Sequence, residues 1–373
     1  MALTDAHYSQ TPGWSGRLSF RTPTAILWVC IFAWSAFAVL LSMALPIEAK
    51  VDAGLWDKIS DYVGHTLLST IVASYLLVMC IAVRRLMSGQ AIDAKSLRPA
   101  EIFQDVIHAT LAFFAIMFAY TTIKVRITQL VPFRWDQTFM EWDRALLGQD
   151  AWRLLDWAYG FPELMEWIAL LYAFWIGIFA AAFTACFVMR QKLGPSAMRF
   201  PLAVIFTWCV GGNLIAMIFS SGGPIYYGSI VEGTNVFAAQ LDALASLDGP
   251  NVSSAVMYSD MLWDIHSGNA LGFGGISAMP SMHCATAFLI ALLVWPLKRW
   301  RWLAVGYTLV IWATSVLLAW HYWIDGLFAL PIALLAWWLA RWVIQQCSED
   351  TRIFGQKSIT TSREESVDAT PHA

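Results

Sequence analysis

The sequence predicts an all-α, polytopic integral membrane protein with a bundle of about eight transmembrane helices. Of its 373 residues, 58% are apolar and only 13% are charged, whereas a soluble domain carries about 25% charged residues. The charged residues also lie in short clusters between apolar runs of about 20 residues, the length that an α-helix needs to cross a bilayer. This composition excludes a soluble globular enzyme. The small net charge of -3, without a basic stripe, argues against a nucleic-acid partner.

Eight apolar runs qualify as membrane spans by length and hydropathy. They cover residues 24–45, 62–83, 102–123, 163–189, 200–221, 280–297, 302–320 and 324–346. Polar residues at the start of the sixth and eighth runs indicate entry from a loop. Residues 1–23 form the predicted N-terminal segment, the first three spans occupy 24–123, and residues 124–162 precede the remaining five spans in 163–346.

Clusters of Lys and Arg follow the second, fourth and sixth spans, which places those loops in the cytoplasm by the positive-inside rule. No Lys or Arg occurs between Phe200 and Leu297, so we expect the long loop in this stretch to face outward. An even number of spans then puts both termini in the cytoplasm. We expect an integral protein of a bacterial inner membrane or a plasma membrane.

Two polar segments flank the spans. Residues 124–162 alternate acidic, basic and aromatic residues, which favours an extracytoplasmic helix lying along the membrane surface. Residues 347–373 are rich in Ser and Thr with mixed charge, which predicts a disordered cytoplasmic tail. The six cysteines show neither a C-x-x-C pair nor a His/Cys cluster at zinc spacing, so we expect no metal site.

Two histidines at the outer ends of predicted spans are candidates for chemistry. His283 follows Pro280 and Ser281, a turn that places a hydroxyl and backbone N–H groups at a helix N-terminus, where an anion is favoured. His321 precedes Asp325 by four residues, which puts both on one helical face. Such a carboxylate fixes the imidazole tautomer and stabilises the imidazolium.

These motifs resemble those of the phosphatidic acid phosphatase type 2 superfamily. Ala278–His283 (A-M-P-S-M-H) and His321–Asp325 (H-Y-W-I-D) are similar to its second and third signatures. They are closest to the M-P-S-x-H and H-Y-x-x-D forms of the inositol phosphorylceramide synthase branch, an inositolphosphotransferase of sphingolipid metabolism. Gly223–Tyr227 (G-P-I-Y-Y) also resembles the Pro/aromatic segment before the second signature in that branch.

The resemblance implies a catalytic core in residues 163–346 and a role for each matching residue. His321 would be the nucleophile that forms a phosphohistidine, with Asp325 as its orienting partner, and His283 would protonate the leaving oxygen. Ser281 would hold a phosphoryl oxygen, and the remaining candidates for substrate binding are Lys124, Tyr226 and Tyr227. The substrates would be membrane lipids, and this chemistry requires no metal or cofactor.

The chain departs from the superfamily's phosphatases at two arginine positions. Their first motif has Arg-Pro where this chain has Val131–Pro132, and their Arg six residues before the third-motif histidine is Ser315 here. Without two guanidinium groups the site should favour a phosphodiester over a phosphomonoester dianion. We therefore expect a phosphotransferase at the outer membrane face. A lipid phosphate phosphatase acting on phosphatidate or polyprenyl diphosphate and a proton-relay transporter are the alternatives.

Overall fold

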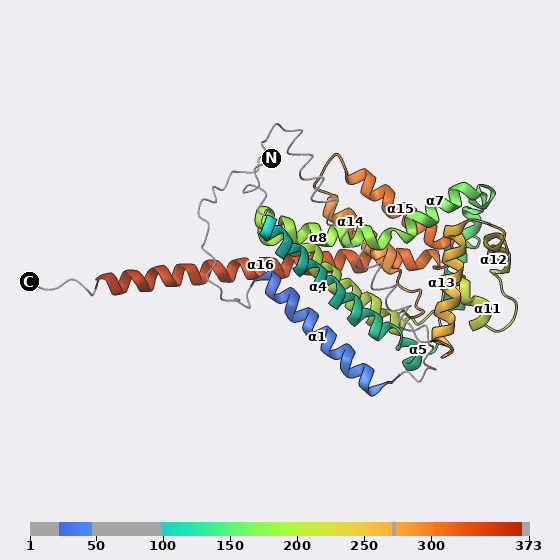
Figure 1. Ribbon diagram of the computed structural model, residues 1–373, viewed down its shortest axis with the longest axis horizontal. Helices are drawn as coiled ribbons and strands as arrows, with labels where there is room; N and C mark the ends of the chain where they lie inside the picture. Colours follow the sequence, from blue (N-terminus) through green and yellow to red (C-terminus); the bar gives the residue numbers. More distant parts are fainter. Residues whose placement is uncertain (1–21, 47–98, 271–273, 368–373) are drawn as a thin grey trace, which may run out of the picture.

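The computed structural model describes residues 22–46, 99–270 and 274–367, and these ranges contain helices and loops without a strand (Figure 1). The longer helices are α1 (Pro23–Ala44), α4 (Pro99–Lys124), α7 (Pro162–Ala173), α8 (Trp175–Leu193), α13 (Pro250–His266), α14 (Met282–Val294), α15 (Arg301–Leu317) and α16 (Trp323–Val367). The shorter ones are α5 (Ile127–Leu130), α6 (Asp136–Leu147), α9 (Arg199–Phe206), α10 (Ala216–Ile218), α11 (Tyr227–Ile230) and α12 (Ala238–Ala245). The 3-10 turns are η1 (Ala151–Leu154), η2 (Asp156–Gly160), η3 (Gly194–Met198) and η5 (Pro224–Tyr226), and η4 (Thr207–Ile215) is a π-helix.

Five helical stretches in the described ranges are long and apolar enough to cross a membrane. They are Pro23–Ala44, Ala100–Leu130, Pro162–Arg190, Gly194–Ile218 and Trp323–Cys347. The predicted sixth and seventh spans correspond to the shorter apolar helices α14 and α15, and the predicted span 62–83 lies outside the described residues. The expected count of eight spans is therefore not confirmed, while the all-helical membrane architecture is.

The shortness of α14 has a local cause. Its 13 residues correspond to about 20 Å of helix at 1.5 Å per residue, less than the roughly 30 Å of the hydrocarbon core. The helix begins just after Pro280 and ends two residues before Pro296. A proline cannot supply the N–H that a helix interior needs and disfavours helical geometry in the residue before it. The two prolines thus confine α14 to a part of the predicted span.

The bundle packs around α9 and α14. The principal helix pairs are α1 with α4, α4 with α8, α9 with α16, and α14 with both α15 and α16. The π-helix η4 continues α9 and brings Gly212 against Tyr120 of α4, where an added Cβ would lie 2.6 Å from the ring. A side chain at this position would push α4 away, so the close packing of the two helices requires glycine.

The two ends of the bundle differ. Helices α11, α12 and α13 gather at one end, and the C-terminal part of α16 extends past the opposite end (Figure 1). Helix α16 continues to Val367, whereas the sequence predicts disorder from residue 347. Extending an existing helix avoids the unfavourable nucleation step, and composition alone does not account for this.

Residues 124–162, for which the sequence predicts a helix lying along the membrane surface, contribute helix α6 to the packed structure. Helix α6 packs against the beginning of α16 and buries Asp136, Phe139, Met140 and Asp143. Their i, i+3, i+4, i+7 spacing forms one helical face. The carboxylates of Asp136 and Asp143 can be buried on this face because each accepts hydrogen bonds from other buried groups.

Candidate active site

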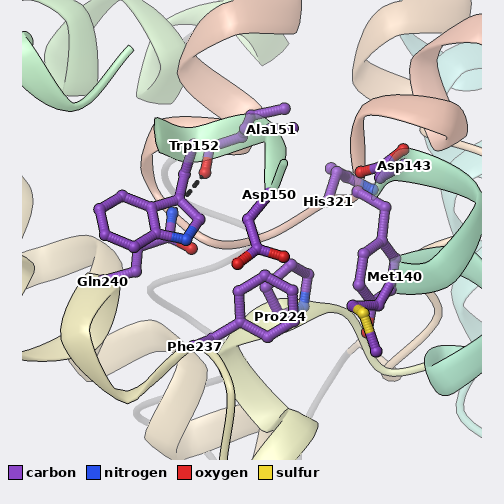
Figure 2. Close-up of a pocket in the computed structure, with 11 residues that line it drawn as sticks. Met140, Asp143, Asp150, Ala151, Trp152, Pro224, Phe237, Gln240 and His321 are labelled. Carbon is purple, nitrogen blue, oxygen red and sulfur yellow. Dashed lines mark hydrogen bonds between the residues drawn. The ribbon is translucent and has the colours of Figure 1, made fainter. Parts of the chain in front are cut away.

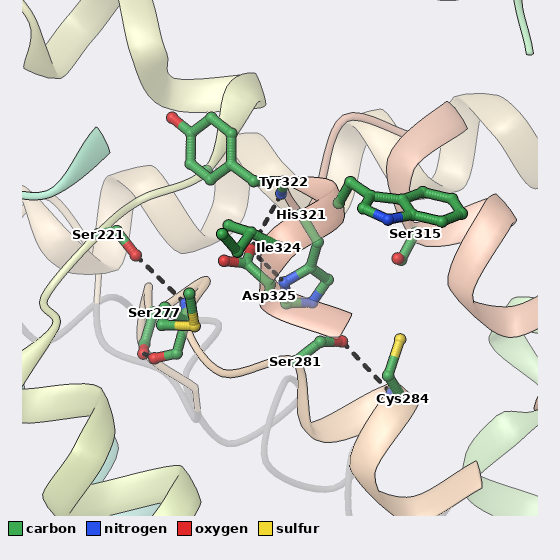
Figure 3. A network of polar contacts seen from close by, with 12 residues as sticks. Ser221, Ser277, Ser281, Cys284, Ser315, His321, Tyr322, Ile324 and Asp325 are labelled. Atoms are coloured by element: carbon green, nitrogen blue, oxygen red, sulfur yellow. Dashed lines mark hydrogen bonds and ion pairs between the residues drawn. The ribbon is translucent and has the colours of Figure 1, made fainter. Parts of the chain in front are cut away.

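The N-terminus of α14 forms one side of the candidate site. Ser281 is its N-cap, and its Oγ accepts a hydrogen bond from the Cys284 N–H at 3.3 Å. The Ser281 N–H donates to the backbone oxygen of Asp325 at 3.2 Å, which joins α14 to the first turn of α16. Figure 3 shows the Ser281–Cys284 bond and the His321–Asp325 pair. A hydroxyl can donate its own proton while it accepts, so Ser281 retains the capacity to bind an oxyanion.

The segment that leads into α16 forms the opposite side and carries the histidine–aspartate pair. His321 lies two residues before the helix begins and Asp325 lies in its first turn, so the two do not share one helical face as their spacing predicts. His321 Nδ1 lies 3.1 Å from Asp325 Oδ2, which also accepts the Tyr322 N–H at 3.0 Å. Asp325 is fully buried. An N–H on Nδ1 directed at this carboxylate leaves Nε2 as the reactive nitrogen. Burial, together with the charge of Lys124, lowers the pKa of His321 to about 3, so the ring is neutral and nucleophilic at physiological pH.

His283 faces this pair from α14. The ring centroids of His283 and His321 are 6.0 Å apart, close enough for the two imidazoles to act on one phosphoryl group. Two aromatic rings hold His283: Tyr172 stacks on it with centroids 4.5 Å apart, and Trp175 lies 4.3 Å away. The predicted span 163–189 is divided between α7 and α8 at Phe174, and this break lies between the two clamping residues.

Lys124 reaches the same site from the end of α4. Its Nζ lies 5.4 Å from the centroid of the Tyr120 ring, and its charge acts on both His283 and His321. The structure thus brings together five of the residues singled out in the sequence: His283, His321, Asp325, Ser281 and Lys124. They come from three segments that are distant in the chain: the end of α4, the N-terminus of α14, and the residues that lead into α16 together with its first turn.

Asp136 of α6 is a site-supporting residue that the sequence reasoning did not single out. Its carboxylate accepts hydrogen bonds from the N–H groups of Gly222 and Gly223, at 2.8–3.0 Å, and from the Tyr322 hydroxyl at 2.9 Å. Asp136 therefore ties the loop at Gly223 to the residue that follows His321. Gly223 has φ +97°, and an added Cβ would lie 2.5 Å from the Trp320 carbonyl oxygen, so this approach also requires glycine.

Asp143, seven residues further along the same helix, has a second supporting role. Its carboxylate oxygens accept the N–H groups of Trp323 at 2.7 Å and Ile324 at 2.9 Å. These are unpaired donors of the first turn of α16, so Asp143 acts as a cap supplied by another helix. Burial raises the pKa of Asp143 to about 7. The signal in the sequence was the i, i+7 spacing of two aspartates on one face.

A small pocket of about 10 Å³ opens beside His321 (Figure 2), about the room that one water molecule requires. Asp150 points into it and is paired with Arg144, whose Nε lies 2.6 Å from its carboxylate. Trp152 Nε1 and Gln240 Oε1 also border it, and neither has a hydrogen-bond partner among the described residues. Polar side chains therefore line the pocket next to His321, the candidate nucleophile.

Two expected substrate-binding residues are not brought to the histidines. Tyr226 donates its hydroxyl to the backbone oxygen of Ser259 at 2.9 Å and stacks on Trp263, which attaches η5 to α13. Tyr227 is buried with its ring against Phe237. These contacts give both tyrosines packing roles in the loop region at the end of the bundle.

Ser315 stands at the position where the superfamily's phosphatases carry the second arginine, and it makes different contacts. Ser315 is buried, its Oγ donates to the Trp312 carbonyl at 2.7 Å, and its own carbonyl accepts the N–H groups of Trp320 and His321. The main chain at Ser315 thus holds the nucleophile candidate, and no guanidinium is present there. In the described part of the chain, no group of three or more His, Cys, Asp or Glu residues is arranged to hold a metal ion.

Comparison with known proteins identifies the chain at the level of a family. Residues 137–339 match the family model of the PAP2 superfamily, a region that contains His283, Ser281, His321 and Asp325. Comparisons with curated proteins and with solved structures give no match. Members of this superfamily are in general phosphatases and phosphotransferases, which identifies the chain as an enzyme in coarse terms. Because the matched region covers more than half of the 373 residues, the chain belongs to the PAP2 superfamily.

Proposed function

We propose that the protein is a membrane phosphotransferase that moves a phospho-headgroup between lipid substrates through a phosphohistidine on His321. The observation that carries the proposal is the pairing of His321 with the buried Asp325, 3.1 Å away, directly opposite His283. Phosphoryl transfer depends on positioning an in-line nucleophile and an acid and on donors for the phosphoryl oxygens. This constellation supplies each of these parts.

The reaction proceeds in two displacements. His321 Nε2 attacks phosphorus, the bond from phosphorus to the leaving oxygen breaks, and His283 donates a proton to that oxygen. The acceptor hydroxyl then attacks the phosphohistidine, gives its proton to His283 and breaks the P–N bond. Asp325 stabilises the positive charge that the His321 ring carries in the intermediate. The same histidine acts as acid and then as base, as microscopic reversibility requires.

The charge of the site favours a phosphodiester donor. Lys124 is the cation that acts on both histidines, and Val131 and Ser315 stand where two arginines are expected. A phosphomonoester dianion needs more positive charge than one lysine provides. The resemblance to the inositol phosphorylceramide synthase branch makes phosphatidylinositol and a ceramide the first donor and acceptor to test.

The proposal also places the site at the outer face of the membrane. The stretch from Phe200 to Leu297 contains no Lys or Arg, and its helices α11 to α13 gather at one end of the bundle, away from the C-terminal part of α16 (Figure 1). This separation supports an outward-facing site and a cytoplasmic C-terminus.

Trapping of the intermediate tests the proposal. Purified protein in detergent should become labelled by phosphatidylinositol carrying ³²P, through an acid-labile bond that His321→Ala abolishes. His108→Ala, on an exposed position of α4, is the matched control and should be labelled like the wild type. Labelling that survives in His321→Ala would refute the covalent mechanism.

A lipid phosphate phosphatase remains the second candidate, because the PAP2 superfamily to which the chain belongs includes phosphatases. The products separate the two functions. The proposed transferase passes label from phosphatidylinositol to an added ceramide, whereas a phosphatase releases inorganic phosphate from phosphatidate and transfers none to an alcohol.

A further inference from the structure

Two buried hydrogen-bond donors in the wall around His283 have no partner. The Tyr172 hydroxyl and the Trp175 Nε1 make no hydrogen bond in the described part of the protein, and the two side chains are only 8% and 9% exposed. An unpaired polar group inside a membrane protein costs free energy, and buried donors are almost always satisfied. Two such donors on one wall of an active site therefore call for a ligand.

The local structure directs both residues at the site. Tyr172 lies in the last turn of α7, Trp175 begins α8, and both rings contact the His283 ring. The Tyr172 ring is nearly parallel to the His283 ring, with an interplanar angle of 18°, and the His283 ring centroid lies 6.0 Å from that of His321. Both aromatic side chains therefore lie next to the histidine pair that would hold a phosphoryl group.

We propose that the Tyr172 hydroxyl and the Trp175 indole N–H bind the non-bridging oxygens of a phosphodiester held between His283 and His321. This inference rests on the proposed function and adds two substrate-binding residues to it. The two donors are neutral, they lie in a region of low dielectric constant, and they are held in place by stacking. Preorganised donors of this kind stabilise a developing negative charge without reorganisation.

Neutral donors suit the charge of this site. A phosphodiester carries one negative charge, which Lys124 balances, and the N–H and O–H groups then satisfy its oxygens. An arginine in the place of either aromatic residue would add charge suited to a dianion. Tyr172 and Trp175 therefore bind the phosphoryl oxygens here, as guanidinium groups do in phosphatases that act on phosphomonoesters.

Binding to a form of the protein that cannot turn over tests this inference. The His321→Ala protein in detergent is titrated with phosphatidylinositol bearing hexanoyl chains, and the dissociation constant is measured by calorimetry. Tyr172→Phe and Trp175→Phe, each added to this background, should weaken binding about tenfold, the typical effect of losing a hydrogen bond to a charged group. Both variants keep an aromatic ring on His283, so they remove the donors and preserve the stacking.

Trp208→Phe is the matched control. Trp208 stacks on Trp175 with centroids 6.0 Å apart, but its Nε1 already donates to Thr286 Oγ1 at 3.2 Å. Its substitution disturbs the same aromatic layer without removing an unpaired donor, and the affinity should remain that of the parent protein. Thermal unfolding in detergent checks that each variant is folded. If Trp175→Phe does not fold, the affinity of Tyr172→Phe alone tests the inference.

The results distinguish this inference from the proposed function. Unchanged affinity in Tyr172→Phe and Trp175→Phe overturns the inference, even when the wild type still forms a phosphohistidine. An equal loss in Trp208→Phe overturns it too, because the effect would then come from packing. Absence of binding to the His321→Ala protein also overturns it. Absence of phosphohistidine in the wild type refutes the proposed function instead.

Discussion

Replacing Asp325 with Asn separates the charge of this residue from its hydrogen bonds. Asp325 Oδ2 accepts both the His321 Nδ1–H and the Tyr322 backbone N–H. The backbone N–H requires an acceptor at this point, so the amide oxygen of an asparagine will occupy the position of Oδ2. His321 then keeps its tautomer. The substitution removes the negative charge and little else from the reacting side of the ring.

The magnitude follows from the distance between the charges. Two unit charges about 4 Å apart attract by about 4 kcal/mol at an effective dielectric constant of 20, and the His321–Asp325 contact is 3.1 Å. Losing this attraction when the His321 ring becomes positively charged slows phosphoenzyme formation by about 10³-fold, since each 1.36 kcal/mol corresponds to a factor of ten. Asp325→Ala also leaves two buried N–H groups without an acceptor and should be slower still.

Single-turnover formation of the phosphoenzyme, measured by rapid quench with labelled phosphatidylinositol, gives the rate constant directly. Asp325→Asn should show the 10³-fold lower rate with binding of the lipid changed less than about threefold, because the charge acts in the transition state and not on the bound ground state. A rate within tenfold of the wild type would show that the carboxylate charge does not assist the nucleophile, and the reasoning would fail.

Three further predictions concern the support of the site and its orientation. Asp136→Ala leaves three buried donors without an acceptor and should lower the free energy of unfolding by at least about 3 kcal/mol. This loss should appear as a lower Tm in detergent, whereas Glu141→Ala, at an exposed position of the same helix, should leave Tm unchanged. Burial raises the pKa of Asp143 to about 7, above its unfolded value near 4, so the folded state retains a proton that the unfolded state releases. The stability contributed by Asp143 therefore falls as pH rises from about 4 to 7. Asp143→Asn does not titrate, so its Tm should rise relative to that of the wild type across this pH range. A difference in Tm between the two proteins that does not change with pH would contradict the raised pKa of Asp143. In a cysteine-free background, Ser253→Cys on α13 should react with an impermeant thiol reagent in intact cells and Lys192→Cys on α8 should not, and reversed labelling would remove the outward-facing site.

Much of the site could be predicted because its chemistry is encoded locally. His321 and Asp325 are four residues apart in the chain, and Ser281 and His283 belong to one turn after Pro280. Such short spacings keep the paired side chains close together, although His321 precedes α16 and the helical repeat therefore does not set its position. The two arginine positions filled by Val131 and Ser315 were visible in the same way.

The supporting residues could not be found by this reasoning, because their partners are distant in the chain. Asp136 accepts hydrogen bonds from Gly222 and Gly223, and Asp143 from Trp323. In the sequence both aspartates alternate with aromatic and basic residues, a pattern typical of a helix on a membrane surface. Their burial becomes apparent only when α6 is placed against α16.

By itself the sequence determined the class of protein, most of the described spans and the residues of the two histidine motifs, because length, hydropathy and helical spacing act within one segment. Tertiary structure alone decided that Lys124 lies near the motifs and that Tyr172 and Trp175 clamp His283. The physical reason is that lipid and protein interior are both apolar. Hydropathy identifies a membrane helix but does not indicate which of its faces packs against another helix, and close packing of particular side chains makes that choice.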